Sequence, residues 1–197
     1  MMNYLEENCV FYKMTPELVA KCGEFLCSKS KDIDDFFHNE YHLYEEGNMC
    51  VSYCFVHKKD KKLVAAFALS MTSITVKDKR VNAEAVQANI NEELIKKHYP
   101  AALIGQLAVF EGYNGMNLSA EILQFIKSII KTKKSSTFII ENEFNNIGCR
   151  FLKVDAVNDP HIIKIYKEAG FIPLFIEKDK APAPETIGMF FDLYALK

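Results

Sequence analysis

Apolar and polar positions follow a clear pattern between Ala102 and Ile130. Residues 103–110 are almost continuously apolar, which is typical of a strand buried in a sheet. Residues 111–118 carry two glycines and two asparagines, as turns do, and from about Ser119 the apolar residues recur at helical spacing. This pattern predicts a strand that turns sharply into a helix N-terminus. Free backbone N–H groups and the helix dipole at such a point favour a phosphate.

The rest of the chain alternates between helical and strand patterns. Helices are predicted from Thr15-Pro16 onward, over 32–44, less clearly over 82–98, and after Asn158; strands are predicted over 50–57, 63–76, 150–157, 171–175 and 189–196. The helix after Asn158 begins with Asp159 as N-cap and Pro160 in its first turn, and it closes at Gly170. The order ααββ(α)βαβαββ predicts an α/β fold, with a mixed sheet and helices on both faces.

Composition narrows the class of protein. A chain of 197 residues with 49% hydrophobic residues is expected to form one domain with a sizeable core. Its formal net charge of −2 gives no general attraction to nucleic acid or to an acidic membrane. The lysine-rich segments 57–62 and 131–134 and the loop with Pro182 and Pro184 are expected at the surface.

The cysteines and the hydropathy of the chain indicate the cellular compartment in which the protein is expected. The six cysteines form no C-x-x-C pair and have no histidine at zinc-finger spacing, so no metal site is expected. The first residues contain no long apolar run, so neither a signal peptide nor a membrane span is expected. A reduced, cytoplasmic protein without a membrane partner fits these features.

Two segments resemble the signatures of one superfamily. Leu107-Ala108-Val109 followed by the turn 113–119 resembles the acetyl-CoA-binding segment of the GNAT superfamily of N-acetyltransferases, whose motif is Gln/Arg-x-x-Gly-x-Gly/Ala. The run 158–171 resembles the second signature, in which an Asn precedes a short helix, a Tyr lies one turn before its end, and Gly-Phe follows. Both occur in the expected order, and the resemblance covers nearly the whole chain. It implies a GNAT-like sheet of six to seven strands, mostly antiparallel.

The turn departs from the superfamily motif at three positions. Asn114 stands where the motif has Gln or Arg, Asn117 replaces the central Gly, and Ser119 replaces the final Gly or Ala. Asparagine tolerates a left-handed backbone better than other non-glycine residues, and serine is a good helix N-cap with a small side chain. The turn is therefore expected to keep its shape, and Gly115 is the one glycine of the segment 113–119.

The resemblance also implies the roles of individual residues. Backbone N–H groups of the strand would meet the pantetheine and acetyl group of acetyl-CoA, from Leu107, Ala108 and Val109. Amides of the turn would meet the pyrophosphate, from Asn114, Gly115, Met116, Asn117, Leu118 and Ser119. Tyr166 would protonate the departing thiolate, since a phenol of pKa about 10 is a credible donor. Asn158 would contact the cofactor arm, or alternatively cap the helix.

Other interpretations of these residues remain open at this stage. Tyr166 shares a helix face with apolar residues, so a place in the core is the alternative to a catalytic role. The sequence does not single out a general base. The carboxylates Glu111, Glu84 and Asp155 are expected near the cleft, yet surface charge explains each of them, and an ordered water could serve equally well.

The leading function is transfer of an acetyl group from acetyl-CoA to a primary amine by one N-acetyltransferase domain, 1–197. The acceptor would be a small-molecule or peptide amine, and a homodimer is left open. The segments 82–99 and 34–37 resemble a branch that includes toxin acetyltransferases acting on aminoacyl-tRNA, although the slightly acidic charge weighs against tRNA. No nucleic acid other than charged tRNA is expected as a partner. A non-catalytic acyl-CoA-binding or scaffold protein on the same fold is the alternative of another class.

Overall fold

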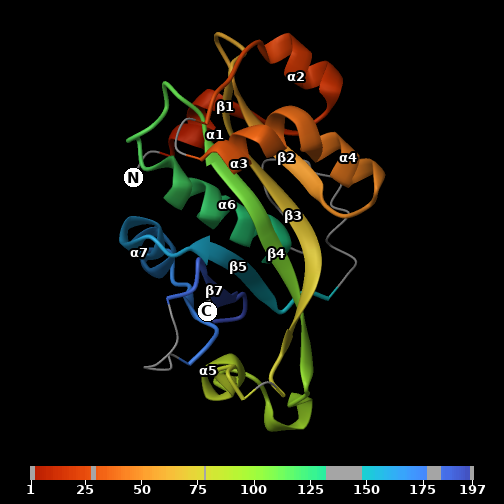
Figure 1. Cartoon of the computed structure of the whole chain (residues 1–197), viewed down its shortest axis with the longest axis vertical. Helices are drawn as coiled ribbons and strands as arrows, with labels where there is room; N and C mark the ends of the chain where they lie inside the picture. Colours follow the sequence, from red (N-terminus) through yellow and green to blue (C-terminus); the bar gives the residue numbers. More distant parts are fainter. Residues whose placement is uncertain (1–2, 28–29, 78, 132–147, 177–182, 196–197) are drawn as a thin grey trace. The chain divides into compact units, whose positions relative to one another are not determined.

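The chain forms an α/β fold in the computed structural model, which describes residues 3–27, 30–77, 79–131, 148–176 and 183–195 (Figure 1). The described strands form one seven-stranded sheet in the order β1-β2-β3-β4-β5-β7-β6. These strands are β1 (Cys9–Lys13), β2 (Val51–His57), β3 (Leu63–Thr75), β4 (His98–Val109), β5 (Phe151–Val157), β6 (Ile172–Pro173) and β7 (Thr186–Asp192). The α-helices are α1 (Tyr4–Asn8), α2 (Pro16–Cys22), α3 (Lys31–Asp35), α4 (Tyr41–Glu46), α5 (Ala83–Gln87), α6 (Leu118–Lys131) and α7 (Pro160–Glu168). A π-helical turn, η1 (Phe36–Glu40), links α3 to α4, and a 3-10 turn, η2 (Glu92–Leu94), follows α5.

The chain divides into two compact units, to which β3, β4 and α6 each contribute on both sides of the division. Unit 1 comprises Met1–Ser70 and Ile104–Ile126, and unit 2 comprises Met71–Leu103 and Lys127–Lys197. In unit 1, β2 pairs antiparallel with β1 and with β3, which confirms the predicted hairpin. In unit 2, β7 pairs antiparallel with β5 and with β6.

The core of unit 1 joins the helical segment 31–46 to the end of β4. Helix α2 begins as predicted, because the Thr15 hydroxyl accepts a hydrogen bond from the Leu18 N–H at 3.2 Å. Phe37, in η1, is fully buried and meets Phe110 edge-on, with 6.2 Å between ring centroids. Phe110 directly follows β4, so this packing fixes η1 against the point where the strand leaves the sheet.

The core of unit 2 is built on a cluster that includes Tyr99, Phe151 and Phe190. Phe151 meets both other rings edge-on, at 5.8 Å from Tyr99 and 5.6 Å from Phe190. Helix α7 begins as predicted, because the Asp159 carboxylate accepts hydrogen bonds from two first-turn amides, His161 at 2.8 Å and Ile162 at 3.1 Å. The N-terminus of α7 is therefore fixed by the Asp159 cap.

The N-terminal elements were not predicted. The chain starts with the short helix α1 and the edge strand β1, which pairs with β2 from Cys9↔His57 to Lys13↔Tyr53. Cys9 is buried, Phe11 is half-buried and Tyr12 is exposed. A strand of five residues with this graded burial does not alternate, so periodicity could not reveal it.

Three other boundaries differ from the prediction. The segment 82–98 is helical only at α5 and η2, and β4 begins at His98. The last strand is β7, at Thr186–Asp192 rather than 189–196. The strand predicted over 171–175 shrinks to Ile172–Pro173, because Phe175 pairs with Val81 in an isolated bridge.

Some surface predictions can be compared directly. Residues 58–62 form the exposed turn between β2 and β3, and Pro184 is exposed, as predicted. Lys133, Lys134 and Pro182 lie outside the described residues. Among the described residues, no helix combines the length and the apolar character needed to cross a membrane.

Candidate active site

The predicted cofactor segment lies at the end of β4 in unit 1. Ala108 is buried in the core, whereas Leu107 and Val109 beside it are half-buried. The strand ends at Val109, and helix α6 begins at Leu118, so the predicted strand–turn–helix is confirmed. Asn114, Gly115, Met116 and Asn117 are all exposed in the turn. Unit 1 thus presents the turn to solvent while it buries the strand that leads to it.

Left-handed backbone shapes the turn. Gly112, Gly115 and Asn117 have φ values of 88°, 84° and 57°. Asn117 therefore replaces the motif's glycine without loss of the left-handed conformation, as predicted from the tolerance of asparagine. Ser119 is not the N-cap of α6, which was its predicted role, because the helix starts one residue before it and Ser119 lies in the first turn.

Backbone donors gather at the same place. In the described part of the chain, the N–H groups of Gly115, Asn117, Leu118 and Ser119 donate to no acceptor, whereas the Ala120 N–H donates to the Asn117 carbonyl at 3.2 Å. Unpaired donors in a glycine-containing turn at a helix start suit an anion, and the dipole of the 14-residue helix α6 adds positive potential. This arrangement can hold a phosphate through the main chain alone.

The neighbourhood of the turn is fixed on two sides. The Glu111 N–H donates to the Leu26 carbonyl at 2.9 Å, which joins the turn to the loop after α2. Tyr113 packs beside Tyr4 and His57, with ring centroids 6.5 and 6.2 Å away, and the His57 Nδ1 contacts an Asp60 carboxylate oxygen at 2.8 Å. The turn is therefore anchored before a ligand arrives.

Tyr166 lies in unit 2, where the end of α7 holds its ring. The Phe171 N–H donates to the Tyr166 carbonyl at 2.9 Å, and the Gly170 N–H donates to the Lys167 carbonyl at 2.8 Å. With φ 82° at Gly170, these are the two bonds of a Schellman motif. The usual apolar contact of that motif is an edge-on pair between the Tyr166 and Phe171 rings, 5.5 Å apart. The sequence Tyr-x-x-x-Gly-Phe thus orients the ring.

The Tyr166 hydroxyl has no hydrogen-bond partner among the described residues, and the side chain is half-buried. Burial raises the pKa of Tyr166 to about 12, because the phenolate loses solvation. The phenol therefore carries its proton throughout the physiological range.

Asn158 follows β5 in unit 2 and does not cap α7, since Asp159 does. Its side-chain amide donates to the Pro184 carbonyl at 2.9 Å, and its N–H donates to the Glu185 carbonyl at 2.9 Å. The amide nitrogen is therefore engaged in holding the segment before β7. A contact with a cofactor can use the side-chain oxygen of Asn158 or the second N–H of its amide.

Lys127 was not predicted to have any special role, yet it is the one charged side chain buried among the described residues. It lies on α6, is only 2% exposed, and donates to the Ala169 carbonyl at the end of α7. Its Nζ lies 3.9 Å from the centroid of the Phe191 ring and 5.4 Å from that of Phe171. Burial lowers the pKa of Lys127 to about 8.

This depressed pKa predicts a pH-dependent stability difference. Between pH 8 and 10.5 the unfolded chain binds the Lys127 proton and the folded chain does not, so stability rises with pH across this window. We compare wild type with Lys127→Met by denaturant unfolding. The variant's relative stability should fall by about 3 kcal/mol between pH 7 and 10.5, while groups common to both proteins cancel. A pH-independent difference would contradict the lowered pKa.

The three carboxylates considered as general base are all exposed, one in unit 1 and two in unit 2. Glu111 is exposed in the turn of unit 1, and Glu84 is exposed on α5 in unit 2. Asp155 is exposed on β5 and accepts a hydrogen bond from Lys153 at 2.9 Å. Within the described ranges, no cluster of ligand residues could hold a metal ion. All six cysteines are free thiols.

Solved structures give an independent comparison of the fold. AtaT complexed with acetyl-methionyl-tRNAfMet superposes with a TM-score of 0.70 at 16% identity, over 96% of this chain and 97% of AtaT. The chain has the fold of the AtaT toxin. A tyrosine-to-phenylalanine mutant of that toxin, bound to acetyl-CoA and the C-terminus of the antitoxin AtaR, gives a TM-score of 0.60 at 15% identity, over 95% of each chain. A tyrosine-to-phenylalanine mutant of KacT gives a TM-score of 0.66 at 13% identity, over 95% of this chain and 96% of KacT.

These likenesses confirm the predicted GNAT-like fold over nearly the full length of the chain. No protein-family model matches the sequence, and a search of curated proteins gives no match. At 13–16% identity, these comparisons show the fold alone. Arguments about the chemistry therefore rest on the residues described above.

Proposed function

We propose that the protein is an acetyl-CoA-dependent N-acetyltransferase. The observation that carries the proposal is the turn at Gly115–Ser119, where backbone N–H groups donate to no described acceptor and helix α6 begins. The pyrophosphate of acetyl-CoA would bind there, while the strand Leu107–Val109 would hold the pantetheine arm. The fold of AtaT, which was solved with acetyl-CoA, supports this choice of phosphate compound.

The chemistry needs a nucleophile, a donor for the oxyanion and a proton for the leaving group. The amine attacks the thioester carbon, and backbone amides of β4 would stabilise the oxyanion. In this proposal Tyr166 gives its proton to the thiolate, and Asn158 contacts the cofactor arm through its side-chain oxygen. A desolvated thiolate has a raised proton affinity as well, which offsets the high pKa of the phenol.

Acetyl-CoA is expected to stabilise the folded protein. A ligand at 100 times its dissociation constant adds about 2.7 kcal/mol to stability, which for a chain of this size raises the melting temperature by roughly 5–10 °C. A thermal-shift titration with acetyl-CoA measures this rise. Adenosine, which lacks the pyrophosphate, serves as the control and should give no rise. The absence of any shift at millimolar acetyl-CoA would contradict the proposed site.

Release of CoA separates the enzyme from a non-catalytic acyl-CoA-binding protein on the same fold. Both would show the thermal shift, but only the enzyme releases free thiol when an amine is added. The panel should contain amino acid amides, polyamines, lysine peptides and aminoacyl-tRNA. Such a reaction needs neither a membrane nor a metal and suits a cytoplasmic protein, either as monomer or as homodimer.

The amine of an aminoacyl-tRNA is a second candidate acceptor. AtaT, which shares this fold, was solved with acetyl-methionyl-tRNAfMet, and a related structure contains its antitoxin. The net charge of −2 opposes RNA binding, because phosphate contacts supply much of its affinity. Unit 2 nevertheless exposes cations in two short stretches, after β3 at Lys77, Lys79 and Arg80 and before β4 at Lys96 and Lys97. Acetylation of Met-tRNA that weakens steeply with salt would favour this acceptor over a small amine or peptide.

A further inference from the structure

We propose that His38 is the general base that takes the proton of the attacking amine, with Asp34 as the residue that positions it. The inference rests on the proposed acetyltransferase function, and it fills the one role for which no carboxylate was singled out. His38 lies in the π-helical turn η1, a type of turn that occurs often at functional sites. Its side chain is 36% exposed, so an amine in solution can reach the ring.

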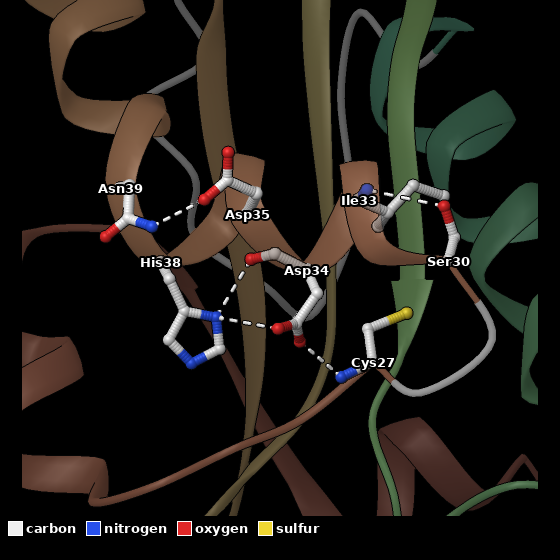
Figure 2. A network of polar contacts seen from close by, with 7 residues as sticks. All are labelled: Cys27, Ser30, Ile33, Asp34, Asp35, His38 and Asn39. Carbon is white, nitrogen blue, oxygen red and sulfur yellow. Dashed lines mark hydrogen bonds and ion pairs between the residues drawn. The ribbon is translucent and has the colours of Figure 1, made fainter.

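The hydrogen bond at Nδ1 fixes the tautomer of His38. Nδ1 lies 2.8 Å from the Asp34 backbone oxygen and 3.6 Å from a carboxylate oxygen of the same residue (Figure 2). A carbonyl oxygen can only accept, so Nδ1 carries the hydrogen in the neutral ring. The lone pair is therefore on Nε2. Figure 2 shows this second ring nitrogen directed away from Asp34, and no described residue forms a hydrogen bond with it.

Asp34 is itself held in place. The Cys27 N–H donates to its carboxylate at 2.6 Å (Figure 2), and the Asp34 N–H donates to the Ser30 carbonyl at 3.0 Å. The carboxylate thus links the loop after α2 to the last turn of α3 and lies beside the imidazole.

The position of the ring relative to the candidate cofactor strand is defined within unit 1. Phe25 stacks on His38, with 4.1 Å between ring centroids and 18° between ring planes. The Phe25 ring also packs against Phe110, with 4.7 Å between centroids. Phe110 directly follows Val109, the last residue of β4. The Leu26 carbonyl also accepts the Glu111 N–H. His38 is therefore one aromatic ring away from the junction of the strand and the phosphate turn.

The step can be written with all atoms accounted for. The amine nitrogen forms a bond to the thioester carbonyl carbon, and the carbon–sulfur bond breaks. The proton lost by the amine goes to Nε2 of His38, and the CoA thiolate takes the phenolic proton of Tyr166. The imidazolium then loses its proton to water, and the phenolate takes one from water. The net products are the N-acetyl amine and free CoA.

Imidazole rescue tests this role. His38→Ala should lower turnover about 10²-fold or more with the best small amine of the panel, with the melting temperature and acetyl-CoA affinity nearly unchanged. Added imidazole should restore part of the lost turnover in proportion to its concentration. A purely structural role would not respond to imidazole in this way.

Two matched variants control for the helix. His42→Ala removes a half-buried histidine of the adjacent α4, and Asn39→Ala removes the neighbouring contact with Asp35 at 2.6 Å. Both should keep turnover and show no imidazole response. Near-wild-type turnover of His38→Ala, or a loss that imidazole does not restore, would overturn the proposal while the wild-type activity stands. If the wild type releases no CoA with any amine, the proposed function itself fails.

Discussion

Replacement of Tyr166 by Phe is expected to lower turnover about 10²–10⁴-fold, the contribution of a positioned proton donor. The substitution keeps the ring that packs on Phe171 and both hydrogen bonds of the Schellman motif, since these use the main chain. It removes only a hydroxyl that has no hydrogen-bond partner among the described residues. The melting temperature should therefore change little. Acetyl-CoA affinity should change little as well, because its proposed main contacts are backbone amides of unit 1.

The measurements are CoA release, melting temperature and acetyl-CoA affinity, made with any amine that the wild type accepts. Tyr194→Phe is the matched control, because Tyr194 is exposed in the same unit and its ring contact with Arg150 survives the change. A core role for Tyr166 predicts the opposite pattern, with stability lost and turnover intact. Such a result would leave the thiolate to be protonated by water. Tyrosine-to-phenylalanine mutants of AtaT and KacT provide folded precedents for this kind of variant.

The parts of the fold that were predicted correctly depend on local signals. The N-caps Thr15 and Asp159 have proline directly after them, and both accept the expected amide bonds. Gly170 adopts the left-handed φ that its place after α7 requires. The strand–turn–helix at 103–118 combines a buried run with a glycine-containing turn. In each case the cause lies within a few residues, so the sequence is sufficient.

The parts that were missed depend on partners far away in the chain. Strand β1 is five residues long and exists because β2 pairs with it. The π-helical turn inside the predicted helix 32–44 adds a residue to one turn, which an apolar pattern does not reveal. The segment 82–98 forms the short helix α5 and the 3-10 turn η2 rather than one continuous helix, because turn and irregular residues separate the two.

The candidate site shows the same division. The spacing of Asp34 and His38, i and i+4 on a predicted helix, was available from the sequence as a sign of a side-chain pair. The stacking of Phe25 on His38 was not, because it brings a loop onto the helix. Lys127 sits among Leu123, Ile126 and Ile130 at helical spacing, and this place on an apolar stripe was a readable sign of burial. Its hydrogen-bond acceptor, the Ala169 carbonyl, could be identified only from the structure.

Gly115→Glu is expected to abolish acetyl-CoA binding while the protein stays folded. A Cβ at this position meets nothing within 4 Å, so the side chain fits in open space. Its carboxylate would stand among the backbone donors of the turn and repel the pyrophosphate. Calorimetry should show no acetyl-CoA binding and no thermal shift. The φ of 84° imposes a strain of about 1–2 kcal/mol on any L residue, which lowers the melting temperature somewhat.

Substitutions at the same position separate charge from strain. Gly115→Ala and Gly115→Lys carry the same backbone strain as the glutamate variant, but neither adds a negative charge at the turn. Both should therefore retain binding, and the lysine should retain more of it than the alanine because its ammonium group attracts phosphate. Equal loss of affinity in all three variants would mean that turn geometry, rather than electrostatics, controls the site. Unchanged affinity in a folded Gly115→Glu protein would remove the phosphate from this turn altogether, and the cofactor would then have to bind elsewhere on the fold.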